Sequence, residues 1–232
     1  MIPLIVIRPQ PGGDATVAAA QRLGLEVAAH PLFAVHALEW TPPEPAQFDA
    51  MLIGSANALR HGGAGLEHYR TLPVYAVGET TADAARAAGM TVAAVGAGGM
   101  QPLLASLQPG HRRLLRLTGR ERMDLRPPAG TTITDVVTFA SKPMPMNDEL
   151  ALLLKTDAIV LLHSGEAGRH FASQCDLREI DRKQVALAAL APRIAELAGP
   201  GWAAVDVAPM PRDEALLALA GRMCQSPPGQ DR

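Results

Sequence analysis

The chain has 232 residues, of which 48% are hydrophobic and 19% are charged, which suits a globular protein of one large domain or two small ones. The formal net charge is −2 and there is no basic block, which argues against nucleic acid as a partner. No apolar stretch is long enough to cross a bilayer, and the opening MIPLIVIRPQ lacks the length and the basic region of a signal sequence. We therefore expect a cytoplasmic protein that has no membrane segment and begins with a strand.

Short apolar runs recur along the chain, and most of them lack the alternating polar residues of half-exposed strands. Such runs are typical of parallel strands that are covered on both faces. The expected strands are Pro3 to Ile7, Met51 to Ile53, Val74 to Val77, Val92 to Val95, Leu114 to Leu117, Ala158 to Leu162, Val185 to Leu190 and Ala203 to Val207. The expected helices are Asp14 to Leu23, Ala56 to Arg60, Thr81 to Ala88, Met100 to Leu107, Glu166 to Gln174, Ile194 to Ala198 and Asp213 to Cys224.

This alternation of strands and helices predicts an α/β fold with open parallel sheets. Two further stretches, Phe33 to Trp40 and Thr134 to Pro143, have strand propensity and lie beside Pro-rich turns, so we interpret them as strands that link two domains. The segment 226–232, SPPGQDR, is polar and rich in proline, and we expect it to be disordered.

The chain contains an internal repeat. FDAMLIGSANALR at 48–60 matches TDAIVLLHSGEAGRHF at 156–171, and downstream Gly78 matches Ala191 and Val95 matches Val207. The beginnings of the two halves are also similar, because LIVIRPQPGG and LLRLTGRERM each precede an expected helix and a second strand. The pattern by itself favours two sequential halves joined near Gly110, each of them a flavodoxin-like unit.

The metal-binding and redox residues form no recognisable pattern. The two cysteines, Cys175 and Cys224, have neither CxxC spacing nor neighbouring histidine ligands, and the seven histidines do not cluster. We therefore expect reduced thiols, no metal and no cofactor.

Polar residues follow several of the expected strands, at the sheet edge where open parallel sheets bind ligands. Ser55 and Ser164 each stand where a strand becomes a helix, so each serine caps a helix, contacts a ligand, or does both. Gly54 and Gly165 beside them allow a turn and a close approach to a ligand.

The segment VGETTADAA is the strongest candidate for an anion site. Gly78 provides a turn, and Thr80 and Thr81 place hydroxyl groups beside the free amides of the next helix. A second glycine-rich loop, Gly96 to Gly99, opens another helix, but no Walker A or GxGxxG spacing indicates a nucleotide phosphate.

Arginines Arg8, Arg120 and Arg122 add positive charge near other strand ends, and no nucleophile–base pair or carboxylate pair is evident. Asp49 and Asp157 precede buried strands and are interpreted as turn caps. These residue types favour a protein that holds and orients a polyanion rather than one that forms a covalent intermediate.

Ordered motifs along almost the whole chain resemble those of the uroporphyrinogen-III synthase family. They are IRP at 7–9, LGLEVAAHPLF at 23–33, FDAMLIGSANAL at 48–59, LPVYAVGETTADAARAAG at 72–89, LLRLTGRERMDL at 114–125 and DAIVLLHSGEAGRHF at 157–171. The motifs at 48–59 and 72–89 are the most specific, and the resemblance is looser in the second half.

The resemblance implies two flavodoxin-like domains joined by a two-stranded linker, in contrast to the sequential halves that the repeat favours. Domain 1 would be discontinuous, formed by residues 1–34 and 143–225, and domain 2 would span residues 41–133. The linker strands would then lie at 35–40 and 134–142.

The resemblance also implies a function, that of a lyase in haem biosynthesis. Family members convert the linear tetrapyrrole hydroxymethylbilane into uroporphyrinogen III, losing water and inverting the terminal ring through a spiro intermediate, without metal or cofactor. Backbone amides and hydroxyls at strand ends hold the substrate's acetate and propionate groups. On this basis the expected substrate-binding residues are Arg8, Ser55, Gly78, Thr80, Thr81, Gly119, Arg120, Ser164 and Arg193.

The sequence departs from the family pattern at two places. Family members often carry a tyrosine on the returning linker strand, proposed as an acid, and Thr138 stands at that position here, which makes it the one candidate catalytic residue. The second-half counterpart of GETTA reads APRIA, so Ala191 and Ile194 replace glycine and threonine, and Arg193 offers a charge for carboxylates instead.

Two other interpretations remain open from the sequence. The departures are compatible with a non-catalytic family descendant that binds tetrapyrroles or another polyanion. An unrelated two-domain α/β module for small anionic ligands would also fit, and it would show two sequential domains. For the enzyme we expect a monomer whose partner is the small-molecule tetrapyrrole substrate, with no nucleic acid and no membrane.

Overall fold

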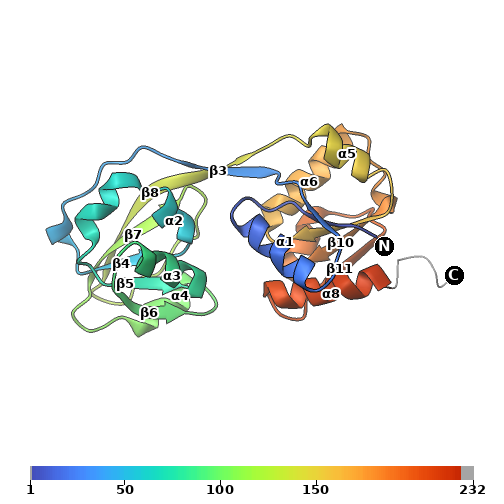
Figure 1. The fold of residues 1–232 in the computed structure, drawn as a ribbon. Coiled ribbons are helices and arrows are strands. Elements are labelled where there is room, and N and C mark those ends of the chain that lie inside the picture. Colours follow the sequence, from blue (N-terminus) through green and yellow to red (C-terminus); the bar gives the residue numbers. More distant parts are fainter. Residues whose placement is uncertain (1, 226–232) are drawn as a thin grey trace. The chain divides into compact units, whose positions relative to one another are not determined.

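The chain forms two compact units (Figure 1), and the computed structural model describes residues 2–225 of it. Unit 1 consists of Met1–Ala34 and Lys142–Arg232, and unit 2 is the continuous segment Val35–Ser141. The segment 226–232, expected to be disordered, lies outside the described residues.

Unit 1 contains a five-stranded parallel sheet with the order β11-β10-β9-β1-β2. Its strands are β1 (Leu4–Val6), β2 (Val27–Ala29), β9 (Ala158–Leu162), β10 (Val185–Ala189) and β11 (Ala204–Val207). Its helices are α1 (Gly12–Arg22), α5 (Asp148–Leu153), α6 (Gly165–Leu177), the 3₁₀ helix η4 (Arg182–Gln184), α7 (Pro192–Ala198) and α8 (Asp213–Gln225). Numbered by their appearance in the unit, these strands have the flavodoxin order 2-1-3-4-5.

Unit 2 is built on a six-stranded sheet with the order β3-β8-β7-β4-β5-β6. Its strands are β3 (Phe33–Ala37), β4 (Ala50–Ile53), β5 (Val74–Val77), β6 (Val92–Gly96), β7 (Arg113–Gly119) and β8 (Thr132–Pro143). Its helices are α2 (Ala56–Arg60), α3 (Glu79–Ala87) and α4 (Met100–Leu103), with 3₁₀ helices η1 (Pro45–Gln47), η2 (Gly63–Tyr69) and η3 (Leu104–Ser106). The segments expected as linkers are largely occupied by β3 and β8, which are neighbours at one edge of this sheet.

The second sheet is a circular permutation of the first. With β7 counted as the first strand, the parallel strands β8-β7-β4-β5-β6 also have the order 2-1-3-4-5. This explains the sequence repeat, because the matching segments 48–60 and 156–171 contain β4 and β9, which occupy the same third position in their sheets. The α/β class with two flavodoxin-like parallel sheets is thus confirmed.

A division into sequential halves at Gly110 is wrong. Strand β7 begins at Arg113, just after Gly110, and pairs with β4 in the middle of the unit 2 sheet. The repeat shows that two segments are related, but strand pairing decides which segments fold together.

Both sheets are covered on their two faces, which accounts for the continuous apolar runs. In unit 1, Leu4 and Val6 pack under α1 and α8, while Ile5 and Ile7 pack under α5, α6 and α7. In unit 2, alternate residues of β4 likewise face α2 and α3 on one side and α4 with η3 on the other. Between residues 2 and 225, no helix combines the length and the apolar character needed to span a membrane.

Sequence analysis missed strand β2 and helix α5. Strand β2 has three residues and none of them is fully buried, so it carries no strong pattern. Helix α5 had a usable signal, because Asn147 caps it by accepting a hydrogen bond from the Leu150 amide at 2.9 Å, ahead of two acidic residues. The helix expected at Met100 to Leu107 is divided into α4 and the 3₁₀ helix η3.

Candidate functional site

The topology of each sheet indicates where a ligand binds. In the order 2-1-3-4-5, helices leave the first and third strands on opposite faces of the sheet, and ligands bind outside the carboxyl ends at that switch point. In unit 1 this point lies between β1 and β9. In unit 2 the corresponding point lies between β7 and β4, where the segment 120–131 joins β7 to β8 without the helix that the repeat predicts. Of the expected site residues, Arg8 and Ser164 mark the point in unit 1, and Gly119 and Ser55 mark the point in unit 2.

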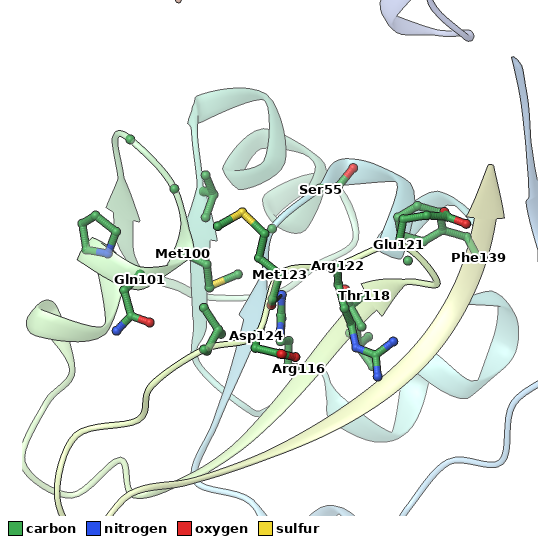
Figure 2. Close-up of a pocket in the computed structure, with 18 residues that line it drawn as sticks. Ser55, Met100, Gln101, Arg116, Thr118, Glu121, Arg122, Met123, Asp124 and Phe139 are labelled. Atoms are coloured by element: carbon green, nitrogen blue, oxygen red, sulfur yellow. Dashed lines mark hydrogen bonds between the residues drawn. The ribbon is translucent and has the colours of Figure 1, made fainter. Parts of the chain in front are cut away.

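Unit 2 has a pocket of about 360 Å³ at its switch point. Figure 2 shows that side chains from several elements line it: Ser55 after β4, Met100 and Gln101 of α4, Thr118 near the end of β7, Glu121 to Asp124 after β7, and Phe139 of β8. Of the expected site residues, Ser55 and Gly119 line this pocket, whereas Gly78, Thr80, Thr81 and Arg120 do not.

Glycines shape two walls of the pocket. Gly98 and Gly99 have φ values of 85° and 112°, a left-handed region that strongly favours glycine, and they form the loop that leads into α4. At Gly119 a β-carbon would lie 2.8 Å from the ring of Phe139, so this glycine allows the aromatic ring to form the wall.

Charges of both signs line the pocket. Arg122 donates a hydrogen bond to Asp135 at 2.7 Å, and the buried Arg116 lies 3.5 Å from the same carboxylate. Two guanidinium groups therefore share one carboxylate, and the positive charge of the pocket is concentrated at Arg116 and Arg122. Glu121 and Asp124 also line the pocket, so an anionic ligand is directed to the arginine side.

Ser55 acts as a helix cap, as the sequence predicts. Its hydroxyl accepts a hydrogen bond from the Asn57 amide at 3.2 Å at the start of α2. The serine also lines the pocket, so capping and ligand contact are compatible at this residue.

The threonine motif is arranged differently from the expectation. Gly78 begins the turn with φ of 76°, and Thr80 is exposed, but Thr81 is buried with only 5% of its surface accessible. The Thr81 amide already donates to the Gly78 carbonyl at 3.2 Å. Thr80 is therefore the hydroxyl that α3 presents to solvent.

In unit 1, Ser164 caps α6 by accepting a hydrogen bond from the Ala167 amide at 3.1 Å. Gly165 has a packing role, because a β-carbon there would collide with Leu197 of α7. Arg193 is exposed in the first turn of α7, while Ile194 packs toward the core.

Sequence analysis missed a polar cluster around Arg8. Asp213, the first residue of α8, accepts hydrogen bonds from Thr16 and His163, both at 2.7 Å, and lies 3.6 Å from the Arg8 guanidinium. Burial raises the pKa of Asp213, but the hydrogen bonds from His163 and Thr16 and the nearby charges outweigh burial and hold that pKa below its usual range. No local signal could reveal the cluster, because Arg8 and His163 follow β1 and β9 while Thr16 and Asp213 lie on α1 and α8.

The His163–Asp213 pair resembles a base with its orienting carboxylate, but its geometry limits its chemistry. An ionised carboxylate only accepts hydrogen bonds, so the Nε2 of His163 carries the proton that is donated to Asp213. The other ring nitrogen, Nδ1, is buried and has no hydrogen-bond partner among residues 2–225. The pair therefore presents no proton-accepting atom to a ligand in this conformation.

Thr138, at the position of the family tyrosine, is fully buried and its hydroxyl has no partner within the described part of the chain. The pairing of β7 with β8 is irregular here, passing from Thr118 with Val137 to Gly119 with Phe139. This bulge leaves Thr138 without a partner on β7, although its carbonyl accepts from the Leu38 amide at 2.9 Å, and it brings Phe139 to the pocket. The hydroxyl at 138 is thus not exposed to a ligand in this structure.

Asp49 binds the segment before β7. Its carboxylate accepts hydrogen bonds from the amides of Arg112 and Arg113 at 3.0 and 2.8 Å and from the Arg113 side chain. In the part of the chain that the structure describes, no three His, Cys, Asp or Glu side chains gather in a way that could hold a metal ion.

The fold and the site define a class of protein: an α/β protein of two flavodoxin-like units, with polar groups at the switch point of each sheet and an open pocket in one of them. The family model described as "Uroporphyrinogen-III synthase HemD" matches residues 14–218, which is most of the chain. The chain belongs to the uroporphyrinogen-III synthase family.

Solved structures support the fold. The uroporphyrinogen-III synthetase of Helicobacter pylori aligns with 96% of this chain and 100% of its own, at a TM-score of 0.65 and 16% identity. A mutant uroporphyrinogen III synthase of the extremely thermophilic bacterium Thermus thermophilus aligns with 97% of this chain and 100% of its own, at a TM-score of 0.53 and 18% identity. No curated protein matches the chain at a significant level.

Proposed function

We propose that this chain is an active uroporphyrinogen-III synthase, a lyase that closes hydroxymethylbilane to uroporphyrinogen III with loss of water and inversion of the terminal ring. The observation that carries this proposal is the family match over residues 14–218, which includes the switch point of unit 2 and, at the switch point of unit 1, β9 but not β1 or Arg8. The reaction belongs to haem and porphyrin biosynthesis.

The physical task of such an enzyme is to control which ring carbon closes the macrocycle. A reactive cation equivalent forms when the terminal hydroxyl leaves, and it can close on the wrong position if the chain ends are not held. Each hydrogen bond to a charged group contributes about 1.5–3 kcal/mol, and about 1.4 kcal/mol changes a product ratio tenfold. A few fixed contacts to substrate carboxylates therefore suffice to control which isomer forms. This accords with a site in which Thr138 is buried and supplies no acid.

The proposed contacts lie at the carboxyl ends of the strands. In unit 2 the pocket supports binding near Ser55 and Gly119, with Arg116 and Arg122 as the source of positive charge. Among the other expected residues, Thr80, Arg120 and Arg193 are exposed and available to a carboxylate. The remaining proposed contacts are Arg8, Gly78, Thr81 and Ser164.

We further propose that the protein acts in the cytoplasm as a monomer, with the tetrapyrrole as its partner and no nucleic acid. Its formal net charge of −2 supports the last point, because a nucleic-acid-binding surface is usually basic.

The decisive measurement is the isomer of the product. Purified protein is supplied with enzymatically generated hydroxymethylbilane, and the uroporphyrins are separated after oxidation. We expect type III to predominate, whereas the same mixture without protein should give type I. Tight binding of hydroxymethylbilane with no type III product would instead identify a non-catalytic tetrapyrrole binder.

A further inference from the structure

The guanidinium of Arg8 is fixed on one side and unoccupied on the other. Its Nη1 donates to the Thr16 hydroxyl at 3.2 Å and lies 3.6 Å from Asp213. Within residues 2–225, neither Nε nor Nη2 has a hydrogen-bond partner, and a third of the side chain is exposed. The Nε and Nη2 donors lie on the same edge of the guanidinium, the edge that binds a carboxylate with two parallel hydrogen bonds.

Residues from three elements hold Asp213 in place beside Arg8. Thr16 on α1 is fully buried, and its hydroxyl accepts from Arg8 while it donates to Asp213 on α8. His163, at the end of β9, donates to the other carboxylate oxygen and has only 9% of its side chain exposed. Asp213 is thereby fixed on both oxygens, and its charge and the Thr16 hydroxyl fix Arg8.

His163 is costly for the fold, and this points to a role beyond packing. A buried polar atom without a partner destabilises a folded protein, and Nδ1 of His163 is such an atom among the described residues. An apolar side chain of similar size would avoid that cost. The hydrogen bond that His163 donates to Asp213 explains why an imidazole stands at this position.

Gly12 leaves the space in which the guanidinium lies. A β-carbon at Gly12 would be 2.7 Å from Nη2, 2.8 Å from Nε and 2.9 Å from the central carbon of Arg8. Because the central carbon is the farthest of the three atoms, a methyl group would press on the guanidinium over its Nε and Nη2 edge. The backbone at Gly12 is otherwise suited to alanine, because its φ is not in the left-handed region and it lies in the first turn of α1.

We propose that Arg8 binds one substrate carboxylate through its Nε and Nη2 edge at the switch point of unit 1, and that Asp213, His163 and Thr16 are positioning residues that hold this edge in place. This inference rests on the proposed function, because it takes a carboxylate of the tetrapyrrole substrate as the ligand. Fixing the arginine before binding reduces the conformational freedom that is lost when the complex forms.

Steady-state kinetics with hydroxymethylbilane test the positioning role. Arg8→Gln removes the charge and the paired donors of this edge, so it should raise KM by at least about tenfold and should leave kcat within about twofold. Asp213→Asn should raise KM by about three- to tenfold. The double variant should be no worse than Arg8→Gln alone, because Asp213 acts through Arg8. Additive effects, or a loss in kcat alone, would overturn the positioning role.

Two matched pairs separate positioning from general stability. His163→Gln keeps a donor for Asp213 and should keep KM near that of the wild type, whereas His163→Leu should raise KM without lowering the melting temperature.

Gly12→Ala should raise KM while the fold keeps its stability, because alanine favours the helix. Gly221→Ala on α8 is the control, since its β-carbon would meet only Leu25 at 3.7 Å, and its KM should not change. Equal KM values for Gly12→Ala and Gly221→Ala would contradict the proposal.

Calorimetric titration with uroporphyrin I, which carries eight carboxylates, gives a readout that does not depend on turnover. We expect Arg8→Gln, Asp213→Asn and Gly12→Ala to weaken its binding about tenfold relative to the wild type and to Gly221→Ala. If the wild type turns over hydroxymethylbilane but these variants bind and react normally, the inference fails and the proposed function stands. If the wild type does not turn over the substrate but binding of uroporphyrin I depends on Arg8, the proposed function fails and the carboxylate site stands.

Discussion

At the scale of single residues, carboxylates in this chain work through the hydrogen bonds that they accept. The side chain of Arg113, and then the amide of the same residue, hold the pKa of Asp49 well below its usual range, more than compensating for the opposing effect of burial. Asp213 is similar, with His163 and Thr16 as donors. Asp49 joins the start of β4 to the start of β7, so its role is to fix the centre of the unit 2 sheet.

The depressed pKa of Asp49 predicts a dependence of stability on pH. A carboxyl group whose pKa is lower in the folded state stabilises the fold above its unfolded pKa of about 3.8, and this stabilisation is lost as the pH falls below that value. Asp49→Asn should therefore unfold at a lower urea concentration than the wild type at pH 7, and the difference should shrink as the pH approaches 3. Asp83→Asn, which alters an exposed pair on α3, should have little effect at either pH. A difference that stays constant from pH 7 to pH 3 would show that the ionised form of Asp49 is not the stabilising one.

At the scale of elements, glycines on α6 allow helix α7 to pack closely. A β-carbon at Gly168 would lie 3.3 Å from the β-carbon of Ala198, and one at Gly165 would collide with Leu197. The sequence suggested that Gly165 makes room for a ligand, but in the structure it makes room for a neighbouring helix. The glycine beside the other serine, Gly54, faces only the end of Met100 at 3.3 Å.

Gly165→Ala should destabilise the protein by about 1 kcal/mol, at the low end of the usual cost of overpacking, because Leu197 is partly exposed and can rotate away. The measurement is the free energy of unfolding in urea. Gly165→Ala combined with Leu197→Ala should lose less than the sum of the two single changes, since the second removes the collision. If the changes are additive, the glycine does not act through Leu197.

At the scale of the whole molecule, the chain order and the spatial order differ. Unit 2 is one continuous segment with its own apolar cores on both faces of its sheet, whereas unit 1 needs both ends of the chain. Strands β1 and β7 both take position 1 in the 2-1-3-4-5 order of their sheets. In the chain, however, β1 is the first strand of unit 1, whereas β7 comes after β4, β5 and β6 of unit 2.

Fragments of the chain test this arrangement, because a domain with its own core can fold alone. The fragment 35–141 should give a cooperative thermal transition and a dispersed amide spectrum. The fragment 1–110, one of the two sequential halves that the repeat suggests, should not, because it lacks β7 from the centre of one sheet and β9 from the centre of the other. A cooperative fragment 1–110 together with an unfolded fragment 35–141 would contradict the division into these units.

Features that depend on local chemistry followed from the sequence. The buried strands were identified because parallel strands covered on both faces require continuous apolar runs, as in Ala158–Leu162. The caps at Ser55 and Ser164 were identified because a serine between strand and helix satisfies free amides. The repeat and the ordered motifs gave the flavodoxin-like fold and the family, since both are properties of the linear chain.

Only the tertiary structure decided which groups meet. Thr16 and Asp213 are 197 residues apart, and no periodicity relates them, so the cluster around Arg8 exists only because β1, β9, α1 and α8 converge at one sheet edge. The choice between Thr138 and Phe139 at the pocket depends on a bulge that shifts the register of β8, and a shift of one residue reverses the face of every side chain. Thr80 and Thr81 are likewise adjacent in sequence, but helix packing buries one and exposes the other. Local sequence therefore determined the elements, and long-range packing determined the site, because strand register and helix contacts depend on partners that are distant in the chain.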